Sequence, residues 1–321
     1  MKKKVSLLIL LMFILNIALV GCTNKTTQEQ KAKETPKEKQ TVNIGLLPSA
    51  DAIPFIIAKH NGYFKEEGVT VNLEHFKSAM DRDSAFQTGN IDGAMADMLS
   101  VIFSNDNGFN VKMTSKTNGS FKLIANKDAN IKNVSDAKGK TIGISKNTVI
   151  EYITDKIMEK ANISENEYEK VAVPKMPTRL EMLHNNKLAT ATLPEPLASD
   201  AINKGGILLS SSEDLGIYPG IMVFSQKAID AKKDEIKAVY RAYNRAIEYL
   251  QKESKDKYID MVIKEGGLPA SLKTASQLPE YTKAVMPSEK DFTAVLDWLK
   301  SKKLTSKDFK FEDLSDSSLI E

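Results

Sequence analysis

The sequence of 321 residues contains one cysteine, one tryptophan and three histidines. A single thiol excludes an internal disulfide, so stability must come from buried apolar surface, which a chain of this length can supply. His60, His75 and His184 do not stand at metal-ligand spacing, and no further cysteine could join them. Phosphate-binding loops, dinucleotide-binding glycine patterns and nucleophile elbows are also missing. We therefore expect no metal, no cofactor and no enzymatic activity.

A net excess of basic residues is nearly absent. The chain has 45 lysines and arginines against 42 aspartates and glutamates, and three of the lysines are Lys2, Lys3 and Lys4. If residues 1–21 are removed, 42 bases face 42 acids, and the rest of the chain is formally neutral. That balance does not favour the basic surface of a nucleic-acid-binding protein, so we expect no nucleic-acid partner.

The single cysteine ends an apolar segment that follows the three lysines. Residues 5–20 are apolar except for Ser6 and Asn16, and they are fewer than the ~20 residues that a membrane-spanning helix needs. A positive start and a short apolar middle are typical of an export signal, with a retained signal anchor as the alternative. The stretch Leu19-Val20-Gly21-Cys22 resembles the lipobox of bacterial lipoproteins.

That resemblance implies a lipoprotein signal peptide at residues 1–21. Cys22 would then carry a diacylglyceryl group, and acyl chains such as palmitate would anchor the chain to a membrane. Residues 22–40 have almost no apolar side chains, so we expect a flexible tether behind the lipidated cysteine. The expected location is the extracytoplasmic face of the cell membrane.

Strand and helix patterns alternate from residue 41 onward. Val42, Ile44 and Leu46 alternate as in a strand, and the next segment is helical, with Pro54 in its first turn and Asp51 as the expected N-cap. Ser78 with Asp81, and Thr148 with Glu151, have the spacing of capping boxes. Alternation of this kind predicts an α/β fold with parallel sheets covered on both faces.

Helical patterns alone follow residue 228. The first of them carries an apolar stripe at a 3.6-residue period, which predicts a buried helix face. The stripe consists of Ile236, Val239, Tyr240, Tyr243, Ile247 and Leu250.

Four stretches in order resemble the substrate-binding proteins of bacterial ABC importers, in the branch that takes nitrate, sulfonate, taurine and a thiamine pyrimidine precursor. They are "IAKHNGYFKEEGVTV", "FQTGNIDGAMAD", "DAKGKTIGIS" and "LATATLPEPLA". Phe86 and Ala137 stand where the family usually has leucine, and residues 186–189 depart from a common Gly-x-Ile-Asp. The resemblance covers about residues 41–298.

The resemblance implies a type II periplasmic-binding fold, in which two α/β lobes are joined by two crossover strands and a ligand binds in the cleft between them. Lobe one would comprise residues 41–121 plus 221–321, and lobe two residues 122–220. Hinge closure would follow ligand binding. The chain is then expected to be a monomer that docks on an ABC permease driven by ATPase subunits.

Ligands of open α/β sheets bind beyond the carboxyl ends of the strands, where helix N-termini offer free N–H groups. Plain helix capping is the alternative role for the residues at these junctions. Lys146 is an exception, because a cation near a helix N-terminus opposes the helix dipole. The candidate ligand-binding residues are Ser49, Asp51, Arg82, Asp97, Lys146, Asn147, Thr148, Glu195 and Tyr218.

These observations favour a lipid-anchored solute-binding protein of an importer. An enzyme on the same two-lobed fold is the alternative, and a surface adhesion or sensor module is a third possibility. Three acids with Arg82 and Lys146 in the candidate set suit a small molecule with hydrogen-bond donors, such as an aminopyrimidine or an amine-bearing sulfonate, better than a bare anion.

Overall fold

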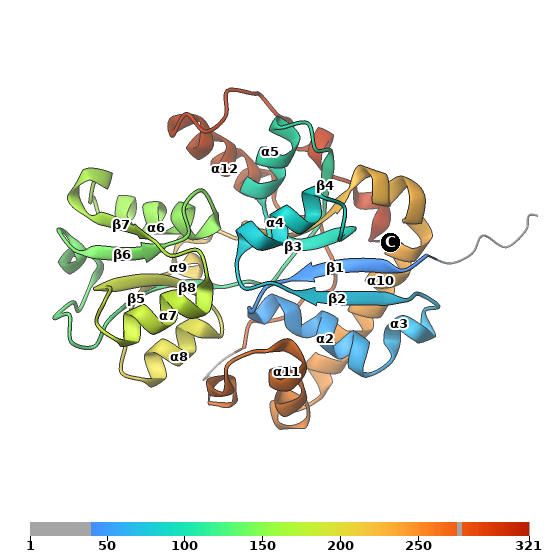
Figure 1. Cartoon of the computed structure of the whole chain (residues 1–321), viewed down its shortest axis with the longest axis horizontal. Helices are drawn as coiled ribbons and strands as arrows, with labels where there is room; N and C mark the ends of the chain where they lie inside the picture. The colour runs from blue at the N-terminus through green and yellow to red at the C-terminus, as the bar shows by residue number, and fades with distance from the viewer. Residues whose placement is uncertain (1–39, 275–277, 321) are drawn as a thin grey trace, which may run out of the picture. The chain divides into compact units, whose positions relative to one another are not determined.

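The strands form two five-stranded sheets in the computed structural model, which describes residues 40–274 and 278–320 (Figure 1). Sheet A has the order β2-β1-β3-β10-β4, and sheet B has the order β7-β6-β8-β5-β9. The strands of sheet A are β1 (Val42–Leu46), β2 (Val71–His75), β3 (Gly93–Asp97), β4 (Val111–Lys116) and β10 (Gly220–Ser225). Those of sheet B are β5 (Phe121–Ala125), β6 (Thr141–Ile144), β7 (Glu169–Ala172), β8 (Thr190–Pro194) and β9 (Ile207–Ser211).

Each sheet contains one strand that runs against its neighbours, which corrects the expectation of purely parallel sheets. In sheet A, β1 pairs in parallel with β2 and β3, whereas β10 is antiparallel to β3 and β4. In sheet B, β6 pairs in parallel with β7 and β8, whereas β5 is antiparallel to β8 and β9. The reversed strands are the two that the chain enters on crossing from the other sheet.

The chain crosses from sheet A to sheet B through residues 117–120 and returns through residues 212–219. We call these the first and second connecting segments. All described residues belong to one compact unit, and the division into two lobes at residues 121 and 220 stays a prediction. The alternation of strands and helices confirms the α/β fold class.

Helices pack around both sheets and fill most of the remaining chain. Among the described residues, no helix combines the length and the apolar character needed to cross a bilayer. The α-helices are α2 (Ile53–His60), α3 (Tyr63–Glu66), α4 (Ala79–Gln87), α5 (Met98–Asp106), α6 (Val149–Lys160), α7 (Met176–His184), α8 (Leu197–Asn203), α9 (Ser212–Leu215), α10 (Gln226–Lys252), α11 (Ile259–Gly266) and α12 (Glu289–Ser301). Short 3-10 turns are η1 (Ala50–Ala52), η2 (Val134–Ala137), η3 (Glu165–Glu167), η4 (Lys255–Lys257), η5 (Ala270–Lys273), η6 (Glu312–Leu314) and η7 (Ser317–Leu319).

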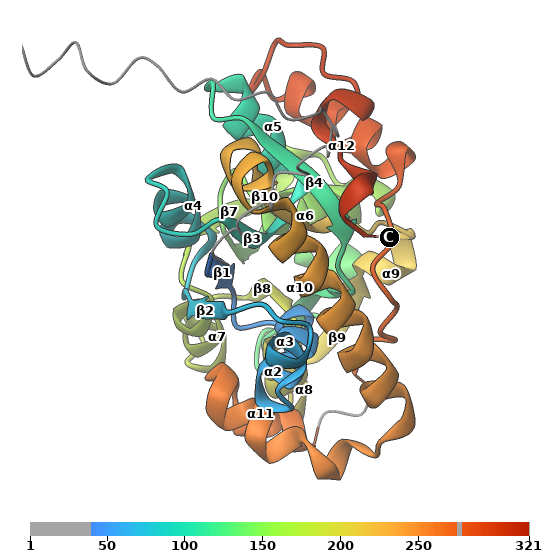
Figure 2. The ribbon, with the colours of Figure 1, turned by 90° about the vertical axis from the view of Figure 1, so that its right-hand side faces the viewer.

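Five of the six residues in the predicted apolar stripe of α10 are buried, and Leu250 is half-buried. This helix runs beside α2 and α3 (Figure 2). Val239 and Ile247 are fully buried, and Tyr240 and Tyr243 retain only 1% and 5% exposure. The two tyrosines are therefore part of the core, as the helical period predicts.

The start of the first helix differs from the sequence-based expectation. A 3-10 turn, η1, precedes α2, and Asp51 lies inside that turn instead of capping the helix. Pro54 does occupy the first turn of α2. The Asp51 carboxylate accepts a hydrogen bond from the Thr117 hydroxyl and not from the helix, because the turn directs it toward the first connecting segment.

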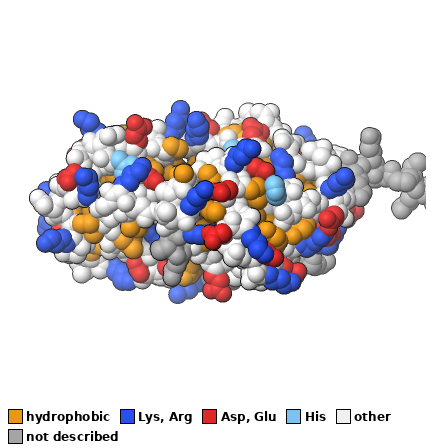
Figure 3. Space-filling model, turned by 90° about the horizontal axis from the view of Figure 1, so that it is seen from below, with side chains coloured by type: hydrophobic (Ala, Val, Ile, Leu, Met, Phe, Trp, Pro, Cys, Tyr) orange, Lys and Arg blue, Asp and Glu red, His pale blue; other side chains and the backbone are white. Residues whose placement is uncertain are grey.

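Buried apolar residues of both sheets share the same clusters. One cluster contains Ile44 and Phe224 of sheet A together with Leu193 of sheet B, and a second contains Ile221 of sheet A and Ile142 of sheet B. The second cluster also contains the inner face of α12, which packs against α5. The surface view of Figure 3 shows lysines and arginines interspersed with acids, without a single-sign patch on that face.

Candidate functional site

The carboxyl ends of the strands in the two sheets meet through main-chain hydrogen bonds. The Ala50 N–H, just after β1, donates to the Glu195 carbonyl oxygen, just after β8, at 2.7 Å. The Met176 N–H, at the start of α7, donates to the Lys77 carbonyl oxygen, just before α4, at 3.2 Å. Ligands of α/β proteins bind at this edge of a sheet, and we call the region the inter-sheet site.

Asp51 is buried at the end of the first strand, with 7% exposure. Its Oδ2 accepts a hydrogen bond from Thr117 Oγ1 at 2.8 Å, whereas its Oδ1 has no partner among the described residues. Burial raises the pKa of the Asp51 carboxyl to about 6, and the Thr117 hydroxyl offsets only part of that effect. Because a buried acceptor without a donor is costly, Oδ1 is a natural partner for a donor on a ligand.

Two glycines let the connecting segments approach this carboxylate. A Cβ at Gly119 would stand 2.6 Å from Asp51 Oδ2, and one at Gly220 would stand 2.6 Å from Thr117 Oγ1. The Thr117 N–H also donates to the Gly220 carbonyl oxygen at 2.9 Å, which ties the first connecting segment to the start of β10, where the second connecting segment ends. Sequence reasoning missed Thr117, Gly119 and Gly220, although an Asn-Gly pair between two strands is a turn signal.

Ser49 lies after β1, as Asp51 does, and Asp97 lies at the end of β3 in the same sheet. Ser49 is buried at the N-cap position of η1, where its side chain makes no capping bond. Asp97 caps α5, since its Oδ1 accepts the Ser100 N–H at 3.0 Å. Burial raises the pKa of the Asp97 carboxyl, and the positive charge of Arg82 lowers it by less. Asp97 is the more firmly held of the two residues.

Arg82 is fully enclosed between α4 and sheet A, with 1% exposure. Its Nη1 donates to the Met95 carbonyl oxygen at 2.6 Å, and its Nη2 donates to Asp83 Oδ1 at 2.6 Å. These bonds hold α4 on β3 and balance the guanidinium charge within the sheet. Arg82 therefore has a structural role in this form, and ligand contact by Arg82 stays a prediction.

The start of α6 contributes the predicted residues Lys146, Asn147 and Thr148. Thr148 caps the helix by accepting the Ile150 N–H at 3.2 Å, and Glu151 Oε2 accepts the N–H of Asn147 at 2.7 Å instead of that of Thr148. The expected capping box is thus displaced by one residue, because Asn147 adopts a left-handed backbone with φ of 57°. Lys146 is exposed beside it.

This helix start faces a carboxylate of the other sheet. The N–H of Val149, the first residue of α6, contributes to lowering the pKa of Asp97 in sheet A. The structure therefore brings Asp97 and the start of α6 together, as expected for residues around one site.

Glu195 is engaged within sheet B. Its Oε1 forms an ion pair with Lys122, and its Oε2 accepts the Ser199 N–H at 3.1 Å in the first turn of α8. The residue is 4% exposed, so both oxygens are occupied away from solvent. A ligand would reach Glu195 only by displacing one of these bonds.

Tyr218 is exposed, like Lys146 and Asn147, with 45% of its surface accessible. It lies in the second connecting segment, next to Pro219, whose carbonyl oxygen accepts the Met98 N–H at the start of α5 at 3.1 Å. The aromatic ring is therefore near the inter-sheet site without being packed into the core.

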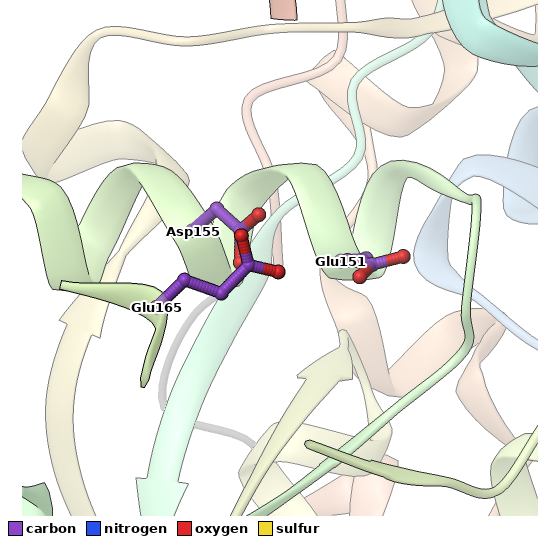
Figure 4. Close-up of side chains that lie close together, drawn as sticks. All are labelled: Glu151, Asp155 and Glu165. Atoms are coloured by element: carbon purple, nitrogen blue, oxygen red, sulfur yellow. The ribbon is translucent and has the colours of Figure 1, made fainter. Parts of the chain in front are cut away.

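A cluster of carboxylates lies outside this site. Glu151 and Asp155 project from α6, and Glu165 approaches them from η3 (Figure 4). Lys170 Nζ lies 2.6–2.9 Å from all three carboxylates, and Lys302 Nζ lies 2.8 Å from Asp155 Oδ2. Two lysines thus supply the positive charge that a metal ion would bring, and we assign the cluster a structural role.

Several solved structures have the same fold. The alkanesulfonate-binding protein SsuA of Xanthomonas axonopodis pv. citri, bound to MOPS, matches with a TM-score of 0.72 and 17% identity over 83% of this chain and 94% of its own. A ligand-binding component of an ABC-type import system of Staphylococcus aureus, with zinc bound, matches with a TM-score of 0.75 and 15% identity. The match covers 88% of this chain and 98% of that chain. The nitrate-binding protein NrtA of Synechocystis PCC 6803 matches with a TM-score of 0.73 and 12% identity. The match covers 88% of this chain and 87% of that chain. These matches confirm the predicted type II periplasmic-binding fold.

No curated protein sequence matches the chain. The family model described as NMT1/THI5 like matches residues 49–256, which is more than half of the chain and includes both connecting segments. The match also includes every candidate residue of the inter-sheet site. The chain belongs to the NMT1/THI5-like family.

Proposed function

We propose that the chain is the solute-binding protein of an ABC importer and captures a small organic molecule at the inter-sheet site. The observation that carries this proposal is the meeting of the two carboxyl edges at Ala50 and Glu195. Helix starts from both sheets converge there, and Asp51 Oδ1 has no partner among the described residues. A ligand held by groups of both sheets would favour their close approach.

The connecting segments would act as the hinge for that movement. Thr117 of the first segment bonds to the Asp51 carboxylate through its hydroxyl and to the Gly220 carbonyl oxygen, at the start of β10, through its N–H. A change at Asp51 would therefore reach the hinge through Thr117. A few residues in short segments can absorb the backbone rotations of hinge closure.

The ligand that we propose is sulfonate-like or taurine-like, or resembles an aminopyrimidine. Alkanesulfonate and nitrate binding by structural relatives supports an oxyanion, and the family description leaves the pyrimidine open. The buried acceptor at Asp51 supports a hydrogen-bond donor on the same molecule.

Delivery would require a permease and its ATPases, with the binding protein held at the extracytoplasmic face of the membrane. The proposed anchor is Cys22, which, like the signal peptide at residues 1–21 and most of the tether at 22–40, lies outside the described residues. We propose that the protein acts as a monomer, since one chain contains both sheets.

Native mass spectrometry of the purified full chain tests the proposal. We expect a retained small molecule, and solution scattering should give a smaller radius of gyration when that molecule is added back to the stripped protein. Uptake of the same molecule should fail in cells that lack the chain. Normal uptake in those cells would contradict an importer function.

An enzyme on the same fold is the alternative. Incubation of the retained compound with the protein, followed by mass spectrometry of the solution, distinguishes the two. Recovery of the unchanged compound is expected for a binding protein, whereas catalytic conversion would establish the enzyme.

A further inference from the structure

Two buried arginines occupy equivalent places in the two sheets. Arg82 on α4 donates to the carbonyl oxygen of Met95 in β3, and Arg179 on α7 donates to that of Thr192 in β8. The sequence separation is 13 residues in each case. The stems also pack alike, because Arg82 Cγ would lie 3.3 Å from a Cβ at Gly45 and Arg179 Cγ would lie 3.3 Å from one at Gly143.

The arginines differ in their counter-charge. Arg82 Nη2 donates to Asp83, the next residue in the helix. Arg179 is followed by the uncharged Leu180. Its Nε and Nη1 donate hydrogen bonds to the carbonyl oxygens of Thr192 and Val173, at 3.0 and 2.7 Å. Its Nη2 has no hydrogen-bond partner within the described part of the chain. Arg179 is 0% exposed, and burial lowers the pKa of its guanidinium to about 9.

A buried cation without a counter-charge is expensive, because desolvation is not repaid by an attraction. Arg82 shows that this fold can supply an internal carboxylate at the neighbouring helix position. The absence of such a carboxylate beside Arg179 leaves a place for an anion from outside the chain.

The N-terminus of α7 points to the same conclusion. No side chain caps this nine-residue helix. The Met176 N–H donates to Lys77, Pro177 has no N–H and the Arg179 N–H donates to the Lys175 carbonyl oxygen, which leaves the Thr178 N–H for an anion. Side chains do cap α4, α5 and α6, whereas α2, α8 and α11 resemble α7 in having no side-chain cap. The side chain of Arg179 starts in the first turn of α7, and its guanidinium is bound to the Val173 carbonyl oxygen just before the helix. A helix dipole and an unsatisfied guanidinium N–H thus act on the same small volume.

We propose that Arg179 and the N-terminus of α7 bind an acidic group of the ligand, such as a sulfonate, phosphate or carboxylate. This inference rests on the proposed solute-binding function and assigns one end of the ligand to sheet B. Asp51 in sheet A is left for a donor group at the other end. Exposed lysines, Lys77 and Lys175, flank the start of α7 and would attract an anion toward it.

Arg179 is enclosed in the present form, where the Met176 N–H donates to the Lys77 carbonyl oxygen of the other sheet. An anion would therefore enter when the sheets are apart, and closure would bring Lys77 over it. Binding of an acidic group and closure would then be coupled.

Thermal unfolding of the full chain with sodium methanesulfonate, compared with sodium chloride at the same ionic strength, tests the proposal. We expect a saturable rise in Tm for the wild type, and loss of that rise in Arg179→Gln. Arg179→Lys should retain part of the rise, because the charge remains without the fork geometry. Arg241→Gln is the control, because Arg241 pairs with Glu67 at the surface and outside the inter-sheet site, and it should leave the methanesulfonate effect in place.

Side-chain ¹⁵N NMR of arginine gives a second readout that does not depend on variant stability. The Arg179 signals should shift with methanesulfonate, while those of Arg241, which pairs with Glu67 at the surface, should not. Equal Tm rises in wild type and Arg179→Gln, or unmoved Arg179 signals, would overturn the anion site. A retained natural ligand without an acidic group would also overturn it, while leaving the solute-binding function intact.

Discussion

Trp298 Nε1 donates to Asp155 Oδ2 at 3.2 Å and so joins helix α12 to helix α6. The other oxygen of the same carboxylate accepts the Tyr168 hydroxyl at 2.8 Å and pairs with Lys170. Oδ1 thus contacts Tyr168 and Lys170 at strand β7 of sheet B. Oδ2 contacts α12, the helix that packs on α5. Lys302 strengthens the second contact.

Trp298→Phe removes the N–H donor and keeps an aromatic ring. We expect a loss of about 1.5–3 kcal/mol in the free energy of unfolding, as for a hydrogen bond to a charged group. Urea unfolding measures the loss. Lys156→Ala is the control, because its ion pair with Glu159 is at the surface, and it should change stability by about 0.5 kcal/mol or less. No difference between the two variants would contradict a fastening role for Trp298.

The buried Asp51 carboxyl should make stability depend on pH. Its folded-state pKa of about 6 lies above the ordinary aspartate value of 3.8. The folded protein therefore holds a proton that the unfolded chain has released, and stability falls as pH rises through this window. Asp51→Asn removes the effect, so its advantage over the wild type should grow by about 2 kcal/mol between pH 4.5 and 7.5. An advantage that does not change with pH would refute the prediction.

The same substitution should have the opposite effect on ligand binding. If a donor of the ligand bonds to Asp51 Oδ1, the charge-assisted bond is lost in Asp51→Asn, and affinity should fall about tenfold or more, at ~1.4 kcal/mol per decade. Isothermal titration with the ligand identified from the native protein measures this. Tighter binding by the Asn variant would mean that an anionic group lies at this end.

Gly119→Ala should disturb the contact between the first connecting segment and Asp51. The added methyl group would stand 2.6 Å from Oδ2 and 2.8 Å from Oδ1, so we expect a cost of about 1–3 kcal/mol from overpacking. In an Asp51→Ala background the space is free, and the same substitution should cost much less. Urea unfolding of the four proteins completes the cycle, and equal costs in both backgrounds would argue against this contact.

Cys22→Ser tests the proposed anchor. We expect the variant to lose lipid attachment and to leave the membrane fraction, because two or more acyl chains are needed for stable anchoring. Cell fractionation and mass spectrometry of the mature amino end measure this. An unmodified amino end in the wild type would disprove the anchor.

Much of the fold can be predicted from local patterns. The strands beginning at Val42 and Gly93 follow from apolar alternation or a buried apolar run, and the buried face of α10 follows from its period. The strand β9 (Ile207–Ser211) was missed, because only part of it is buried and its apolar residues do not alternate. The antiparallel strands β5 and β10 differ from the predicted parallel sheets. Each is the strand by which the chain enters a sheet from the other one, and local sequence patterns do not show that crossing.

The site was harder to predict than the fold. Junction residues such as Asp97 and Thr148 do converge, because the carboxyl ends of neighbouring strands share an edge. Thr117 and Gly119 were missed, since their importance comes from a contact with Asp51, 66 residues from Thr117 in the sequence. Arg179 looks like any helical arginine until its neighbours in space are known.

The strand order of sheet A has a consequence for the order of folding. Strand β10 lies between β3 and β4, so the inner ladder of sheet A needs a segment that follows all of sheet B in the chain. Sheet B is built from the continuous stretch 121–211 and can assemble while residues 220–225 are still unpaired. Long-range strand pairing is slow. The pairing of β10 with β3 and β4 therefore completes sheet A, and it can join these two strands only after the whole segment of sheet B has been synthesised.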